Sequence, residues 1–281
     1  MTVLVDEIGA IAAENVETIL GTAKIAPTGP RSDVWSRLAE GGWTTLTADA
    51  DSGLGLRGIQ EVARITGRFS VSTPLVTTLL AARWFDLPED GLLLGASVAL
   101  PWGAQRAFPY IADGVTLLEP AGTDTGLSPS SLSRDDFSQV MPLGLTPGSA
   151  LAPELKPDHR AELVAVLAAV TVGCADAVLA RSVEWSQTRQ QFGQPIKSFQ
   201  AIRHHLADMH IAREQAWTAA LAAGHDQDRA DSWSAYACGL AKSAIELGIQ
   251  VHGGIGFTWE VGLQHFLCHV LQIEALIGQS R

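Results

Sequence analysis

The sequence has few of the residues that mark disulfide-rich or metal-binding proteins. It holds only three cysteines among 281 residues, Cys174, Cys238 and Cys268. Each lies inside a helical pattern without metal-ligand spacing, so we expect no metal site. An odd number of separated thiols indicates buried free cysteines in a reducing compartment, for which we expect the cytoplasm.

Basic residues are also scarce. Lys and Arg number 19 against 30 Asp and Glu, which gives a formal net charge of -11 and a pI near 5.1. This balance argues against nucleic-acid binding, which needs a basic face. It leaves room for a local basic pocket that holds a phosphate ligand.

Long apolar runs are lacking as well. Hydrophobic residues make up 47% of the chain, but no uninterrupted run reaches the roughly 18 residues of a membrane span. Asp6, Glu7 and Glu14 surround the first apolar stretches, where a signal peptide would be basic and then apolar, so we expect none. The length suits one large domain or two modest ones.

The spacing of apolar residues divides the chain into three parts. Residues 1–90 carry helical spacing, for example from Ile8 to Leu20, and predict an N-terminal helical domain. Residues 91–150 hold short apolar runs separated by Gly, Pro, Ser and Asp, and predict a small β-rich middle segment. Residues 151–281 return to helical spacing. The expected fold is therefore mainly α with a small β segment.

Four long helices are expected in the last part, over about 158–188, 199–224, 231–250 and 258–277. Pro157–Asp158 gives a helix start signal, and Pro195 prevents a helix from crossing the break at 189–198. Short connections between long helices favour an antiparallel four-helix bundle.

The break after the first of these helices carries the segment RQQFGQPIKSFQ, from Arg189 to Gln200. Phe192 and Gly193 turn the chain, which holds Arg189 at a rigid corner. A guanidinium there can make paired hydrogen bonds to a diphosphate, and Gln200, expected one turn further on, can donate an amide. The alternative is that Arg189 is a helix cap and salt-bridge partner.

A second segment, QVHGGIGFT, runs from Gln250 to Thr258. Gly253 and Gly254 interrupt a helix and let a backbone approach a flat ligand or a phosphate without a Cβ clash. Gln250 projects from the preceding turn, and His252 is expected to form hydrogen bonds in the loop. The alternative is that the two glycines only form a loop.

Together, the two segments resemble the flavin-contacting C-terminal domain of the acyl-CoA dehydrogenases, over about residues 158–275. The resemblance implies that family's fold and the α,β-dehydrogenation of an acyl-CoA thioester, with FAD as cofactor and an electron-transfer acceptor. It also implies contacts to an FAD held mainly by a neighbouring subunit. The residues that take this role are Arg189, Phe192, Gln200, Gln250, Gly253 and Gly254.

The resemblance fails at two places. The middle domain of that family is normally longer than residues 91–150 and holds two flavin-binding stretches that are missing here. The family's glutamate base would fall at Ile277 or, in its alternative location, near Leu163, and apolar side chains cannot accept a proton. The remaining candidates for the base are Glu260, expected in the first turn of the last helix, and Glu274. Glu162 lies one residue from the alternative position, about 100° around the helix.

These gaps resemble the shortened subunits of α2β2 heterotetrameric acyl-CoA dehydrogenases that are associated with steroid degradation. In such a pair, a second acyl-CoA dehydrogenase-like subunit would supply most of the FAD site and the base. Two alternatives remain open. One is an autonomous homo-oligomer with a relocated base, and the other is a flavin-free structural or assembly subunit.

Overall fold

A computed structural model of the chain describes thirteen ranges: residues 7–21, 37–38, 40–43, 46–48, 52–70, 75–84, 94–99, 105–106, 116–118, 127–128, 144–145, 150–151 and 157–278. All of the candidate site residues lie within these ranges. The boundary expected near residue 90 lies outside them.

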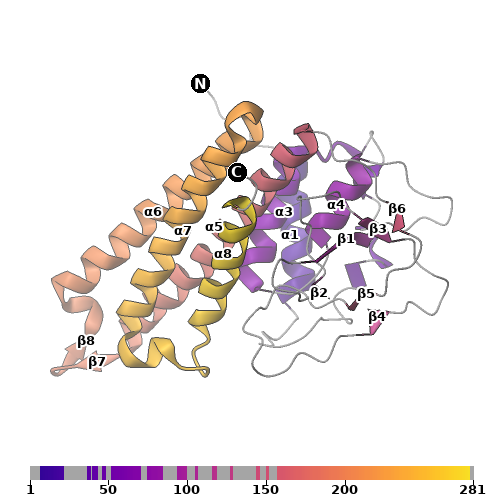
Figure 1. The fold of residues 1–281 in the computed structure, drawn as a ribbon. Helices are drawn as coiled ribbons and strands as arrows, with labels where there is room; N and C mark the ends of the chain where they lie inside the picture. Colours follow the sequence, from indigo (N-terminus) through magenta and orange to yellow (C-terminus); the bar gives the residue numbers. More distant parts are fainter. Residues whose placement is uncertain are drawn as a thin grey trace.

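The N-terminal part is helical, as its apolar spacing predicts. The helices are α1 (Glu7–Gly21), α3 (Leu56–Phe69) and α4 (Leu75–Trp84), with a short 3-10 turn, η1, at Leu46–Ala48 (Figure 1). Val16 and Leu20 of α1 are fully buried. Ile8 and Ile11 were expected on the same apolar face, but they are 47% and 60% exposed.

The middle segment forms short strands, which confirms the small β segment. A four-stranded antiparallel sheet has the order β2-β1-β3-β6. Its strands are β1 (Leu94–Ala99), β2 (Gln105–Arg106), β3 (Thr116–Leu118) and β6 (Ala150–Leu151). The strands β4 (Leu127–Ser128) and β5 (Gly144–Leu145) pair separately. In Figure 1 the strands lie toward the N-terminal helices, and β1 contacts α4.

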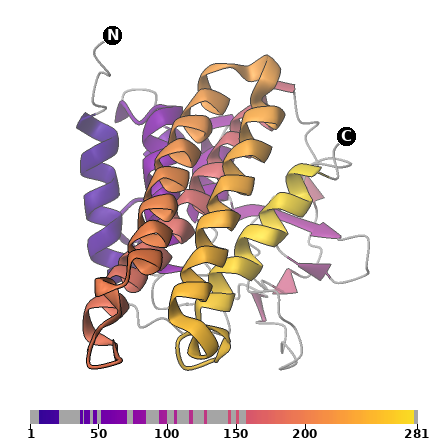
Figure 2. The same cartoon turned by 90° about the vertical axis from the view of Figure 1, so that its left-hand side faces the viewer.

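The last part forms the expected bundle, with helices α5 (Pro157–Thr188), α6 (Gln200–His225), α7 (Ala230–His252) and α8 (Leu263–Gly278) (Figure 2). A 3-10 turn, η4 (Gln227–Arg229), joins α6 to α7. The predicted start of the last helix at residue 258 is wrong. The chain first forms the 3-10 turn η5 (Gly253–Phe257), and Gly262 has a φ of +70°, which helical backbone does not adopt, so α8 begins at Leu263.

Helix α5 is the centre of the molecule, since it contacts α3, α6, α7 and α8. By length and composition it could cross a membrane, but 83% of its most apolar window is buried within the molecule, as in a core helix. It approaches α3 where Gly173 lies against the backbone of Arg64 and Gly67 lies against that of Val170, and neither glycine has room for a Cβ. The glycines therefore set how closely the N-terminal helices pack on the bundle.

Candidate functional site

The candidate flavin contacts meet at one end of the bundle. Helices α5 and α7 end there and α6 and α8 begin there, so residues 189–200 and 250–262 lie together (Figures 1 and 2). We call this the hairpin end. All six residues expected to contact FAD lie at it, and all six are exposed.

The break between α5 and α6 is a tight β-hairpin, a structure that the sequence did not reveal. Strand β7 (Gln190–Gln191) pairs with β8 (Gln194–Pro195), and the 3-10 turn η3 (Ile196–Ser198) leads into α6. Phe192 and Gly193 form the two-residue turn with φ of 51° and 78°, the positive pair that matches strand twist. An aromatic residue pays a strain cost at positive φ. Phe192 is 92% exposed, with its ring edge-on to Phe199 at 6.0 Å.

Arg189 is held by its backbone, while its charge has no counter-ion in the described part of the chain. Its N–H donates to the carbonyl of Trp185 and its carbonyl accepts from Ile196, both at 2.9 Å. The guanidinium lies 5.7 Å from the centre of the Trp185 ring, and none of the ion pairs between described residues includes it. The salt bridge considered as an alternative is thus absent there. Gln200 is the first residue of α6, not one turn into it.

The three glycines of the second segment differ in backbone conformation and in the space around them. Gly253 has a φ of +68° and caps α7 by donating to the carbonyls of Gln250 and Ile249. A Cβ on Gly256 would lie 2.6 Å from the Ile249 oxygen. Around Gly254, nothing lies within 4 Å of an added Cβ. The chain itself therefore requires the first and third glycines, whereas Gly254 leaves open space for a group from outside.

The two positions expected for the catalytic base lie at the opposite end of the bundle, where α5 begins and α8 ends. Leu163 and Ile277 are 1% and 3% exposed and belong to the same apolar core. The neighbouring Glu162 is tied to α4, because it accepts from the Trp84 indole at 2.7 Å and from Arg83 at 3.1 Å. Neither base position thus carries a proton acceptor.

The two other candidates for the base, Glu274 and Glu260, lie in polar surroundings. Glu274 accepts from the Lys242 ammonium at 2.8 Å through both oxygens, which ties α8 to α7. Glu260 lies in the turn before α8, so its expected place in the first turn of a helix is wrong. Hydrogen bonds from its own backbone N–H and from the Thr258 hydroxyl lower the pKa of Glu260. Glu274 is therefore engaged in an ion pair, whereas Glu260 is stabilised in the ionised form.

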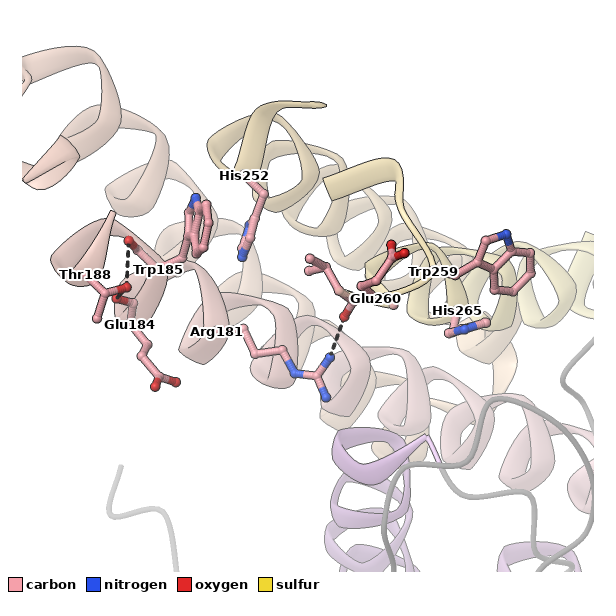
Figure 3. Close-up of a pocket in the computed structure, with 10 residues that line it drawn as sticks. Arg181, Glu184, Trp185, Thr188, His252, Trp259, Glu260 and His265 are labelled. Atoms are coloured by element: carbon pink, nitrogen blue, oxygen red, sulfur yellow. Dashed lines mark hydrogen bonds between the residues drawn. The ribbon is translucent and has the colours of Figure 1, made fainter. Parts of the chain in front are cut away.

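A cavity of about 470 Å3 lies beside the hairpin end, between the last turns of α5, the end of α7 and residues 259–265 (Figure 3). His252 lines it, and its Nδ1 donates to the Gly248 carbonyl at 2.8 Å within α7, so the expected loop hydrogen bond is wrong. Arg181 also lines it and belongs to no motif. In the sequence, Arg181 is marked only as an arginine that follows the small and apolar residues 177–180 of α5.

Comparison with known proteins agrees with this architecture. Residues 165–280 match the family described as "Acyl-CoA dehydrogenase, C-terminal domain". The probable acyl-CoA dehydrogenase YngJ of Bacillus subtilis (strain 168) is 39% identical over 121 residues, which are 41% of this chain and 32% of YngJ. The chain therefore spans about a third of the length of this relative.

Solved structures share the fold at low sequence identity. A variant of the Tcur3481-Tcur3483 steroid ACAD has a TM-score of 0.66 at 19% identity, over 97% of this chain and 92% of that chain. The ChsE4-ChsE5 complex from Mycobacterium tuberculosis has 0.65 at 17%, over 99% and 95%. PigA with FAD and proline has 0.60 at 16%, over 99% and 96%. Residues 165–280 thus match the acyl-CoA dehydrogenase C-terminal domain family, and the chain has an acyl-CoA dehydrogenase-like fold.

Proposed function

We propose that the chain is one subunit of an FAD-dependent acyl-CoA dehydrogenase, and that it contacts a flavin held chiefly by a partner chain. The observation that carries the proposal is the difference between the two ends of the bundle. At the hairpin end, Arg189 has no ion-pair partner among the described residues and Gly254 faces open space. At the other end, Leu163 and Ile277 fill the base positions with buried hydrocarbon.

The described residues at the hairpin end fit the chemistry of a dinucleotide. The Arg189 guanidinium can donate two hydrogen bonds to a diphosphate, which are stronger than neutral ones. Gly253 and Gly254 leave backbone accessible, and the amides of Gln200 and Gln250 can donate beside them. When bound, FAD supplies the oxidising centre that takes a hydride from the β-carbon of the acyl-CoA thioester, and an electron-transfer acceptor receives the electrons.

We assign the base that takes the α-proton to the partner chain. The side chains of Leu163 and Ile277 have no basic atom, and Glu274 is bound to Lys242. Glu260 lies in the turn between α7 and α8, whereas the family's base positions lie at the far end of the bundle. The role of this chain is therefore binding and orientation.

The expected partner is a second acyl-CoA dehydrogenase-like subunit in an α2β2 assembly. The ChsE4-ChsE5 structure is a complex of two differently named chains, and the Tcur3481-Tcur3483 protein is named a steroid ACAD. Both support a heteromeric enzyme for a bulky acyl-CoA of the steroid type. We assign residues 1–90, 91–150 and 151–281 as its domains. Three unpaired cysteines support a cytoplasmic location.

Turnover tests the proposal. The chain is purified alone and together with the dehydrogenase-like chain encoded nearest to it, and reduction of an electron acceptor is followed with a series of acyl-CoA thioesters. We expect turnover only from the pair. Turnover by the chain alone, lost in Glu260→Gln or Glu274→Gln, would establish an autonomous enzyme instead. A stable pair that never contains FAD would establish a structural subunit.

A further inference from the structure

The cavity beside the hairpin end shares no lining residue with the flavin contacts or the base positions, although its wall residue Trp185 lies next to the Arg189 guanidinium. None of the six residues assigned to FAD lines it, and the base positions lie at the other end of the bundle. Its volume of about 470 Å3 falls in the range of small-molecule sites. Its lining includes the exposed residues Glu184, Thr188, Trp259 and Glu260, so it opens to the surface. It does not depend on the proposed function.

Arg181 supplies the positive charge of this cavity. Its guanidinium is partly buried, lies 4.9 Å from the centre of the Phe266 ring and donates one long hydrogen bond, 3.4 Å, from Nη1 to the Val261 carbonyl. Burial lowers the pKa of Arg181, and no carboxylate of the described residues forms an ion pair with it to oppose that effect. A buried cation without a counter-ion is costly, and Nε and Nη2 are left to bind an anion.

Two other arginines of the helical core, unlike Arg181, have an acidic partner among the described residues. Arg64 and Arg213 both donate to the carboxylate of Asp176, and Arg64 does so at 2.6 Å. Like Arg181, both side chains are partly buried, with exposures of 18% for Arg64 and 21% for Arg213. Among the described residues, Arg181 thus lacks the acidic partner that its counterparts have.

Aromatic rings flank the guanidinium on both sides (Figure 3). Trp185 stacks on His252, with ring centres 5.5 Å apart and planes 12° apart. Trp259 lies 5.0 Å from His265. Burial, reinforced by the charge of Arg181, lowers the pKa of both histidines, so they are neutral at neutral pH. The cavity therefore combines flat apolar walls with one positive charge.

The mouth of the cavity is acidic. Glu184 and Glu260 are exposed there, and the lining contains no lysine. A single guanidinium behind two carboxylates favours a ligand with one negative charge over a phosphate dianion, which the mouth would repel more strongly. A carboxylate also matches the planar fork of arginine. The aromatic walls favour a flat apolar body.

We propose that this cavity binds a small organic carboxylate with a flat apolar body. The carboxylate pairs with Arg181, and the body lies between the Trp185–His252 pair and the Trp259–His265 pair. The ligand is defined here by its chemistry, as a monoanionic aromatic or polycyclic acid.

The test is calorimetric titration of the full chain with 2-naphthoate, compared with uncharged 2-naphthylmethanol and dianionic 2-naphthyl phosphate. We expect one site that prefers the carboxylate. Arg181→Met should weaken binding at least tenfold, whereas Arg203→Met, which changes an exposed arginine of α6 outside the cavity, should leave it unchanged. Circular dichroism confirms that each variant is folded.

Two further variants keep the test decisive if Arg181→Met does not fold. Trp259→Ala removes an exposed wall and should weaken binding, and Glu260→Gln should tighten it about two- to fivefold by removing a negative charge at the mouth. Equal affinity for naphthoate and naphthylmethanol, no binding at millimolar ligand, or weaker binding in Glu260→Gln would overturn the proposal. Displacement of naphthoate by FAD or by the partner chain would show that the cavity belongs to their sites, and would overturn it too.

Discussion

The ammonium of Lys242 on α7 lies 2.8 Å from each carboxylate oxygen of Glu274 on α8. Glu274 lies three residues before Ile277, the position expected for the base. The side chains of Lys242 and Glu274 are 29% and 36% exposed, so solvent screens the attraction and the pair stabilises the bundle by about 1 kcal/mol at most. The geometry indicates a connection between two helices.

Glu274→Gln therefore separates a structural role from a catalytic one. We expect the variant to lower the free energy of unfolding by about 0.5–1 kcal/mol and to leave kcat of the assembled enzyme within about twofold. Urea denaturation and steady-state turnover measure the two quantities. A fall in kcat of about a hundredfold or more, the scale of lost acid–base catalysis, would make Glu274 the base and refute its assignment to the partner.

Gly254→Ala and Gly256→Ala form a matched pair of substitutions two residues apart. A Cβ on Gly254 meets no atom within 4 Å, so the unfolding free energy should change by less than about 0.5 kcal/mol. A Cβ on Gly256 meets the Ile249 carbonyl, which should cost about 1–3 kcal/mol. In the assembled enzyme, Gly254→Ala should nevertheless weaken FAD binding. Unchanged FAD affinity would remove Gly254 from the flavin site.

The contact between α3 and α5 predicts a second glycine pair. Gly173 lies against the Arg64 backbone, whereas Gly239 of α7 has nothing within 4 Å of an added Cβ. Gly173→Ala should destabilise the chain by at least about 2 kcal/mol through overpacking. Gly239→Ala should stabilise it by up to about 1 kcal/mol, because alanine is the better helix former. Thermal and urea unfolding of both variants check this contrast, and equal effects would contradict the close helix contact.

His269 predicts a pH dependence of stability. Burial lowers the pKa of His269 to about 4, and the ring Nδ1 lies 3.8 Å from the Cys174 sulfur. The pKa in an unfolded chain is about 6.5, so the unfolded state binds a proton first as pH falls. Stability is therefore full above pH 6.5 and is lost between pH 6.5 and pH 4, by at most about 1.4 kcal/mol per pH unit from this group.

The contribution of His269 is isolated by comparing the wild type with His269→Gln. The free energy of unfolding of both proteins is measured between pH 6.5 and pH 4. The variant should show a shallower slope, since its side chain takes up no proton. Other groups, such as His252 and His265, whose pKa values burial also lowers, remain in both proteins and leave part of the slope. Identical slopes would mean that His269 is solvated in the folded chain.

The sequence predicted the helices of the bundle because their signals are local. Pro157 and the break at Arg189 bracket α5, and its apolar stripe extends between them. The start of α8 was misplaced because η5 and the positive φ of Gly262 interrupt the helical spacing without an obvious sequence signal. The strands of the 190–195 hairpin are only two residues long, too short for any periodicity to appear.

The sequence indicated the residues at the hairpin end but not the cavity around Arg181. Arg189 and Gly253 stand in motifs whose spacing marks them, and the antiparallel course of the helices brings the motifs to one end. The cavity around Arg181 could not be predicted, because it forms only when residues 259–265 fold back against α5. Arg181 belongs to no sequence motif, and its surroundings are set by tertiary contacts alone.

Whether FAD is shared between two chains is tested most directly by its dissociation constant for the assembled pair, measured in the wild type and in Arg189→Ala. Arg229→Ala is the control, because Arg229 is exposed between α6 and α7 at the other end of the bundle. We predict that the chain alone binds no FAD, and that Arg189→Ala weakens binding to the pair by about 2–3 kcal/mol, the range for a charged hydrogen bond. An FAD affinity equal to wild type in Arg189→Ala would contradict the shared site.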